Sequence, residues 1–223
     1  MLALFDLDHT LLDGDGDDLW CRFLVRHGLA APELQVRNEF MGERYRAGSI
    51  GTQAFSDFYA GLLAGRTPAF WAPWQERFLA EEIRPRLPAA ARAQVAWHRA
   101  AGHLLVLTTA SNRVIAERTA AELGFDHLLA TELALSDGVY TGQVRGTPNM
   151  RDGKLLRLRE WLAARGLDEV VLATAWFYSD SINDLPLLAA VGRPVAVSPD
   201  PMLERHAAAQ GWPVLQLLGP ADE

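Results

Sequence analysis

The stretch that decides the fold is "MLALFDLDHTLLDGDGDD", residues 1–18, in which a short apolar run leads directly into six aspartates. Residues 2–6, "LALFD", have the length and apolar character of a buried strand. Asp6 and Asp8 stand at i and i+2 at its end, so in an extended chain their side chains point to the same side. Like charges at ~4 Å repel by about 4 kcal/mol at an effective dielectric near 20. The closely spaced carboxylates therefore require either a cation that compensates their charge or different roles at different positions.

The composition is that of a folded chain with a substantial core, because 49% of its 223 residues are hydrophobic. The net charge of −7 argues against a nucleic acid or an acidic membrane as partner, since both require a basic surface. The single cysteine, Cys21, excludes an internal disulfide and fits a reducing compartment. The start of the chain has no basic region before its apolar run, and no stretch has the length of a membrane helix. We therefore expect a cytoplasmic protein.

The order of the predicted elements indicates an α/β fold with a helical insertion. Between the first strand and residue 88, four helical patterns follow one another without a strand, at 17–28, 33–48, 52–65 and 68–82. We therefore predict a doubly wound parallel sheet, formed by residues 1–13 and 88–223, with an all-helical cap, residues 14–87, inserted after the first strand.

From residue 88 onward strands and helices alternate, as in βαβ units. The pattern "LALSDGVYTGQV", residues 133–144, predicts a hairpin that turns at Asp137-Gly138. The other predicted strands are 103–110, 127–131, 170–180 and 193–199, and the predicted helices are 88–102, 111–124, 152–166, 182–192 and 202–211.

Polar residues stand where several of these strands end. Asp6 and Asp8 follow the first strand, Thr109 ends another, and Asp180 and Asp184 follow the strand that includes "WFYS", while Lys154 opens a helix. In a doubly wound sheet these loops meet at one edge. A divalent cation held by Asp6 and Asp180 would relieve the repulsion, and Mg²⁺ suits hard oxygen ligands. The whole set suits a dianionic phosphate.

Four segments resemble the signature motifs of the haloacid dehalogenase (HAD) superfamily, in the right order. They are "DLDHT" at 6–10, "LLVLTTAS" at 104–111, "DGKLL" at 152–156 and "YSDSINDLP" at 178–186. The similarity extends to the C-terminus and is greatest to subfamily IB, the phosphoserine-phosphatase-like branch. One departure is Ser179, where many members have glycine, and we expect this small residue to change little.

The resemblance implies a Mg²⁺-dependent phosphatase that acts on a phosphate monoester. Asp6 would be the nucleophile that becomes an aspartyl-phosphate, and Asp8 would be the general acid and then the base. Asp6, the backbone carbonyl of Asp8 and Asp180 would hold Mg²⁺, with Asp184 supporting the metal shell. Lys154 and a threonine hydroxyl would hold the phosphoryl oxygens. Thr108 and Thr109 are both candidates for that hydroxyl, and we prefer Thr109 at the strand's end.

We expect the substrate to be a small phosphorylated metabolite, for which Asp15 and Ser111 are candidate binding residues; a role in the surface loop alone is the alternative for Asp15. Asp15 lies nine positions after Asp6, where phosphoserine phosphatases place a glutamate that binds the substrate amine. Their cap arginine has no counterpart near Phe58 or Tyr59. We therefore expect an amino-alcohol phosphate such as histidinol phosphate, or phosphoserine. A phosphotransferase to an alcohol and a phospho-accepting signalling module remain alternatives, and the chain could be a monomer or a homodimer.

Overall fold

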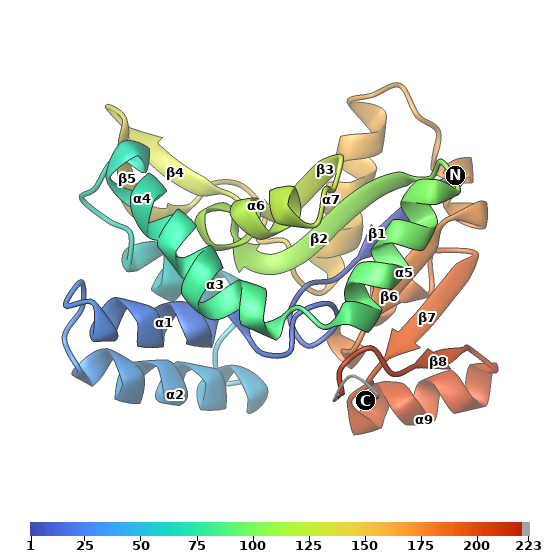
Figure 1. The fold of residues 1–223 in the computed structure, drawn as a ribbon, viewed down its shortest axis with the longest axis horizontal. Coiled ribbons are helices and arrows are strands. Elements are labelled where there is room, and N and C mark those ends of the chain that lie inside the picture. Colours follow the sequence, from blue (N-terminus) through green and yellow to red (C-terminus); the bar gives the residue numbers. More distant parts are fainter. Residues whose placement is uncertain (220–223) are drawn as a thin grey trace.

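Six parallel strands form the central sheet of the computed structural model, which describes residues 1–219 (Figure 1). Their order across the sheet is β3–β2–β1–β6–β7–β8, with every neighbouring pair parallel. Since β1 pairs with β2 on one side and β6 on the other, the chain order reverses beside β1, where ligands bind in such sheets. The predicted doubly wound sheet is confirmed, with strands at Leu2–Phe5 (β1), Leu104–Asn112 (β2), His127–Thr131 (β3), Trp176–Ser179 (β6), Arg193–Val197 (β7) and Val214–Leu215 (β8).

Helices cover both faces of this sheet because its central strands are apolar on both sides. Ala3 and Phe5 of β1 belong to one core, and Leu2 and Leu4 to the other. The first core includes residues of α5 (Ala89–Ala100) and α6 (Arg113–Glu122). The second includes residues of α7 (Asp152–Ala163), α8 (Leu185–Leu188) and α9 (Pro201–Gln210). No helix within residues 1–219 is long and apolar enough to cross a membrane.

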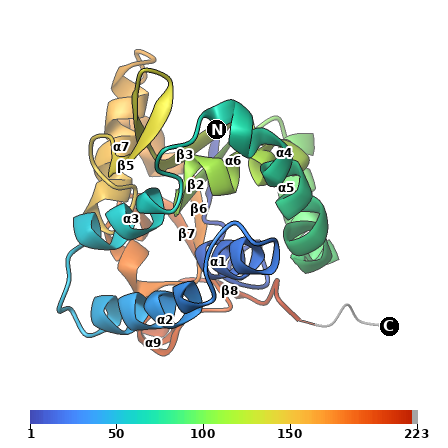
Figure 2. The same cartoon turned by 90° about the vertical axis from the view of Figure 1, so that its left-hand side faces the viewer.

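Four helices separate β1 from α5 along the chain, in agreement with the predicted helical patterns. Figures 1 and 2 show them beside the carboxyl ends of the central strands. Aromatic side chains hold them together, since the Trp20 ring lies 4.9 Å from Phe78 and 5.8 Å from Trp71, centroid to centroid. The helices are Gly16–Arg26 (α1), Glu33–Arg46 (α2), Thr52–Gly61 (α3) and Pro68–Phe78 (α4), followed by a π-helical turn, Leu79–Ile83 (η1), and a 3₁₀ turn, Arg84–Arg86 (η2).

The predicted hairpin is present as β4 (Leu133–Ser136) and β5 (Val139–Val144). Asp137 and Gly138 have φ of 50° and 76°, as a two-residue turn of the mirror-image type requires. The hairpin packs against α3, where the Val144 N–H donates to Asp57 Oδ1 at 2.9 Å. It therefore extends the wall that the inserted helices form.

The prediction of one strand over 170–180 is wrong in its first half. Glu169–Thr174 is a 3₁₀ helix (η3), and only Trp176–Ser179 is a strand. The Asp168 side chain accepts a hydrogen bond from the Val170 N–H at 2.8 Å, and the Val170 side chain is 70% exposed. A local cap and the absence of a covering layer therefore outweigh the strand propensity of the two valines.

The predicted helix at 182–192 is shorter and divided. It consists of a 3₁₀ turn, Ile182–Asp184 (η4), followed by the four residues of α8. The Ser181 hydroxyl accepts a hydrogen bond from the Asn183 N–H at 3.3 Å, which starts the tight turn. The short 3₁₀ turn places Asp184 at its end, close to the sheet edge.

Candidate active site

A cleft of about 760 Å³ opens at the carboxyl edge of the sheet, between the strand ends and the inserted helices. Its volume lies in the range of small-molecule sites. Of the residues that the sequence analysis selected, six line the cleft: Asp6, Asp8, Asp15, Lys154, Asp180 and Asp184. Thr109 and Ser111 lie just behind its surface and contact Asp8. The predicted site residues are therefore together, although they come from distant parts of the chain.

Lys154 joins two carboxylates at the floor of the cleft. Its Nζ lies 2.7 Å from Asp6 Oδ1 and 2.6 Å from Asp184 Oδ2, and all three side chains are at most 9% exposed. Lys154 is in the first turn of α7, and Asp6 directly follows β1. Burial would lower the pKa of Lys154, but the two carboxylates outweigh it and raise that pKa. The ammonium is therefore charged at any physiological pH.

Asp8 is held by three donors that leave it in a fixed orientation. The Gly16 N–H donates to Oδ1 at 2.6 Å, while the hydroxyls of Ser111 and Thr109 donate to Oδ2 at 3.0 and 3.2 Å. Burial, followed by repulsion from Asp15 and Asp6, raises the pKa of Asp8 to about 7. A carboxyl group with that pKa can both give and take a proton near neutral pH.

The two candidate threonines face different ways. The Thr108 hydroxyl accepts a hydrogen bond from Asn149 Nδ2 at 3.0 Å and is fully buried, whereas the Thr109 hydroxyl points to Asp8. The pairing of β2 with β3 shifts register after Thr108, so the strand does not stop at Thr109 but continues to Asn112. Thr109 is therefore not the last residue of its strand, and it is buried behind the cleft surface, in contact with Asp8.

Asp180 is positioned by a residue that the sequence analysis did not select. The Thr10 hydroxyl accepts from the Asp180 backbone N–H at 3.0 Å and donates to Asp180 Oδ1 at 3.2 Å. Burial, followed by repulsion from Asp6 and Asp184, raises the pKa of Asp180 to about 8. Thr10 closes the "DLDHT" motif, so its place in that segment was the available signal.

Ser179, which we expected to change little, makes a hydrogen bond within the site. Its hydroxyl donates to Asp184 Oδ2 at 2.7 Å, the oxygen that also receives Lys154 Nζ. A glycine at this position could not supply that bond. Ser179 is buried, so the bond adds a second donor that orients Asp184.

The carboxylate oxygens at the strand ends are suitable ligands for a hard divalent cation such as Mg²⁺. Asp6 and Asp180 supply carboxylate oxygens, and the repulsion between the two carboxylates contributes to the raised pKa of Asp180. A cation between them would remove that repulsion. Within residues 1–219 no group of three or more His, Cys, Asp or Glu side chains is arranged as a metal site. Backbone, water or substrate oxygens would therefore have to complete the shell.

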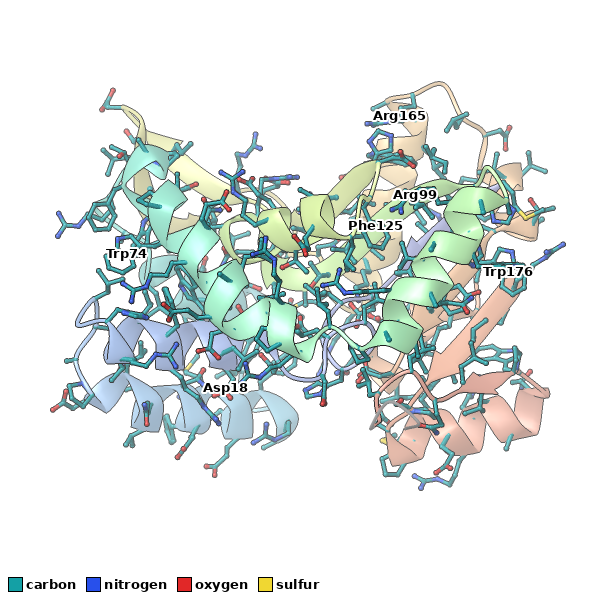
Figure 3. All side chains as sticks on the ribbon, in the orientation of Figure 1. Asp18, Trp74, Arg99, Phe125, Arg165 and Trp176 are labelled. Atoms are coloured by element: carbon teal, nitrogen blue, oxygen red, sulfur yellow. The ribbon has the colours of Figure 1, made fainter. Side chains whose placement is uncertain are left out.

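The acidic residues after Asp8 have unequal surroundings. Asp15 is exposed and caps α1, accepting from the Asp18 N–H at 3.0 Å. Asp18, labelled in Figure 3, contacts Arg22 at 2.9 Å and accepts from Asn38 Nδ2 of α2 at 3.0 Å. Asp17, in the first turn of α1, is 9% exposed and lines the cleft. The sequence analysis missed it because helix spacing alone does not show which first-turn acid turns inward.

Comparison with known proteins agrees with this geometry. The chain is 39% identical to a histidinol-phosphatase of Neisseria meningitidis serogroup C (strain 8013) over 216 residues, which are 96% of this chain and 97% of that protein. A crystal structure of a protein with unknown function from Bordetella pertussis Tohama I matches with a TM-score of 0.93 at 45% identity and covers 97% of this chain and 98% of that one. A substrate-bound phosphoserine phosphatase shares the fold, with a TM-score of 0.69 at 18% identity over 96% and 91% of the two chains.

A family model gives the remaining comparison. The model described as haloacid dehalogenase-like hydrolase matches residues 3–189, which include every strand-end residue described above. The chain belongs to the haloacid dehalogenase-like hydrolase family.

Proposed function

We propose that this protein is a Mg²⁺-dependent phosphatase that hydrolyses a small-molecule phosphate monoester through an aspartyl-phosphate on Asp6. One observation carries the proposal. Lys154 contacts Asp6 at 2.7 Å, and Asp8, two residues along, is held in the same cleft with a pKa near 7. A shielded carboxylate nucleophile beside a group that can give and then take a proton is what two-step phosphoryl transfer needs.

The first step forms a bond between an Asp6 carboxylate oxygen and phosphorus. The bond from phosphorus to the substrate oxygen breaks, and Asp8 gives its proton to the departing alkoxide. Lys154 lowers the repulsion between the Asp6 carboxylate and the phosphate dianion. The Thr109 hydroxyl, which donates to Asp8 in the free protein, would turn to a phosphoryl oxygen of the bound ester.

The second step releases phosphate. Asp8, now ionised, accepts a proton from a water that attacks phosphorus, and the Asp6 carboxylate leaves with its bonding electron pair. Asp8 is again protonated and Asp6 again ionised, so the groups are ready for another turnover. The hydrogen bonds from Gly16 and Ser111 keep Asp8 in one place through both steps.

Asp6, Asp180 and the Asp8 carbonyl would hold Mg²⁺, supported by Asp184. When bound, the ion supplies charge neutralisation for the phosphate and for the acidic residues. Phosphatases of this family generally use Mg²⁺, and we propose that this chain does so too. We also propose that residues 14–87 act as a cap over the site, which excludes water while the ester is bound.

The proposed substrate is an amino-alcohol phosphate, with histidinol phosphate ahead of phosphoserine. The similarity to the Neisseria protein named histidinol-phosphatase supports this order. The sequence showed no arginine at the expected cap position, but Arg37 of α2 lies 5.6 Å from the centroid of the Phe58 ring. Four further arginines line the cleft: Arg22, Arg46, Arg86 and Arg151. A carboxylate-bearing ester such as phosphoserine therefore belongs in the same assay.

The test measures phosphate release from histidinol phosphate, phosphoserine and para-nitrophenyl phosphate, with Mg²⁺ and with a chelator. We expect wild type to act only with Mg²⁺, and Asp6→Asn to lose at least 1000-fold in kcat because its amide is a poor nucleophile. Asp13→Asn, a matched change at an exposed aspartate, should keep activity. Release of no phosphate by the wild type, or full activity of Asp6→Asn, would refute the proposal. An added alcohol that collects the phosphoryl group would identify a phosphotransferase.

A further inference from the structure

Two buried polar atoms in the cleft have no hydrogen-bond partner among the described residues. They are Oδ1 of Asp17 and the hydroxyl of Tyr45, whose residues are 9% and 8% exposed. Both residues line the cleft. Leaving such groups unpaired is unfavourable, most of all for a carboxylate. Neither group has a place in the proposed reaction at Asp6.

Asp17 differs in this respect from the aspartates on either side of it. Asp15 accepts the Asp18 N–H, and Asp18 is paired with Arg22 and Asn38. Burial, followed by repulsion from Asp15 and Asp8, raises the pKa of Asp17 well above its usual range. The free protein therefore holds Asp17 in a state that a cationic ligand would improve.

The surroundings of Asp17 favour an organic cation. Phe55 and Tyr59 line both the cleft and a small adjoining cavity beside Asp17. The Phe55 ring lies 4.3 Å from Tyr45 and 5.1 Å from Tyr59, centroid to centroid, so the three rings form one aromatic wall from α2 and α3. The Arg151 guanidinium already lies 4.6 Å from the centroid of the Tyr45 ring, so Phe55 and Tyr59 are the rings that matter for a ligand beside Asp17. Aromatic faces attract ammonium and other organic cations, and a neighbouring carboxylate adds a charged acceptor.

We propose that Asp17 is a specificity residue that accepts a hydrogen bond from a protonated nitrogen of the substrate, beside the rings of Phe55 and Tyr59. The proposal rests on the proposed phosphatase function, in which the phosphate end of the same molecule lies at Lys154 and Asp6. A single cleft holds both ends, since Asp17 and Lys154 line it together. The substrate class that fits is a phosphate monoester that carries an amine or an imidazole.

A structural role for Asp17 is the competing explanation. The adjoining cavity measures about 10 Å³, close to the volume that one water requires, and Asn112 Nδ2 beside it also lacks a partner. A water bridging Asp17 and Asn112 would make Asp17 important for stability. It would give no reason for Asp17 to distinguish one phosphate ester from another.

The experiment compares kcat/KM for histidinol phosphate with that for para-nitrophenyl phosphate, which has no cation, in wild type, Asp17→Asn and the matched Asp18→Asn. We expect Asp17→Asn to lower the ratio of the two values by about tenfold or more, mostly through KM for the cationic ester, as for a lost charge-assisted bond. Asp18→Asn should keep the wild-type ratio. We also expect Asp17→Asn to be at least as stable as wild type, because it removes a buried ionisable group whose Oδ1 has no partner.

An unchanged ratio in Asp17→Asn, or an equal fall in Asp18→Asn, would overturn the proposal. A clear loss of thermal stability in Asp17→Asn with both esters affected alike would do the same and favour the bridging water. If wild type hydrolyses para-nitrophenyl phosphate but no amine-bearing ester, the inference about Asp17 fails while the phosphatase function stands. If it hydrolyses no ester, the proposed function itself fails.

Discussion

Removing the Lys154 ammonium is the sharpest test of the electrostatics at the floor of the cleft. Lys154→Met keeps most of the aliphatic chain but leaves Asp6 and Asp184 as neighbouring buried carboxylates without a cation. Each contact at about 2.7 Å corresponds to ~6 kcal/mol of gross Coulomb attraction at an effective dielectric near 20, much of which desolvation offsets. Breaking a buried pair from one side costs about 3–5 kcal/mol net. We therefore expect the free energy of unfolding to fall by at least ~3 kcal/mol.

The assay is urea unfolding at pH 7.5 with a chelator, so that no divalent cation replaces the lysine. The slope of the free energy against urea should stay the same, because the surface exposed on unfolding does not change. The loss should shrink at pH 5, because burial raises the pKa of Asp6 to about 6 and removal of Lys154 would raise it further, so Asp6 is then neutral. Asp184→Asn in the Lys154→Met background should recover part of the stability, because one of the two unpaired charges is gone.

The reasoning is refuted if Lys154→Met costs less than about 1 kcal/mol at pH 7.5. It is equally refuted if the loss is the same at pH 5 as at pH 7.5, because a packing defect would show no such dependence. Lys154→Arg is the matched control, since it retains the positive charge. Its loss should be smaller than that of Lys154→Met.

Three further predictions concern other parts of the site. Gly16→Ala should lower kcat at least tenfold, because its Cβ would lie 2.9 Å from Asp8 Oδ1 and displace that carboxylate; a steady-state assay with unchanged kcat would contradict this. Mg²⁺ should raise Tm more at pH 8 than at pH 5.5, because burial raises the pKa of Asp6 to about 6 and that of Asp180 to about 8. Protonation of these two groups stabilises the folded protein at low pH, and this stabilisation is lost as the pH rises through the two pKa values, so that the ion then takes the place of the protons. Equal Tm shifts at the two pH values would contradict a metal site at Asp6 and Asp180. Asn149→Ala should cost at least about 2 kcal/mol in urea unfolding, since the fully buried Asn149 amide donates to three acceptors, and a neutral result would show that water replaces it.

The sheet could be predicted from the sequence because its signals are local. Apolar runs such as residues 2–5 can only be buried strands when turns and helices surround them, and alternation with helices implies parallel pairing. The hairpin at Asp137-Gly138 was predictable for the same reason, since both turn residues adopt positive φ readily. The segment 169–174 was not, because only its exposure and the Asp168 cap decide against a strand.

Some residues of the candidate site could be predicted from the sequence, and others could not. Asp6, Asp8, Lys154, Asp180 and Asp184 could be chosen from the sequence because strand ends in a parallel sheet meet at one edge. The choice between Thr108 and Thr109 needed the register shift in β2, which depends on pairing with a distant strand. The bond from Ser179 to Asp184 likewise required the tight turn after β6.

By itself the sequence determined which residues carry charge, which segments are apolar and how they alternate, and those local properties suffice for the sheet and its reactive edge. Only the tertiary structure decided which side chains face each other across the cleft. The six aspartates of residues 6–18 show the difference. Helix spacing predicts the pair of Asp18 with Arg22, four residues later in α1, but it does not show that Asn38 of α2 also donates to Asp18 while Asp17 Oδ1 is buried without a partner. Burial and pairing depend on contacts between elements far apart in the chain, so no local pattern encodes them.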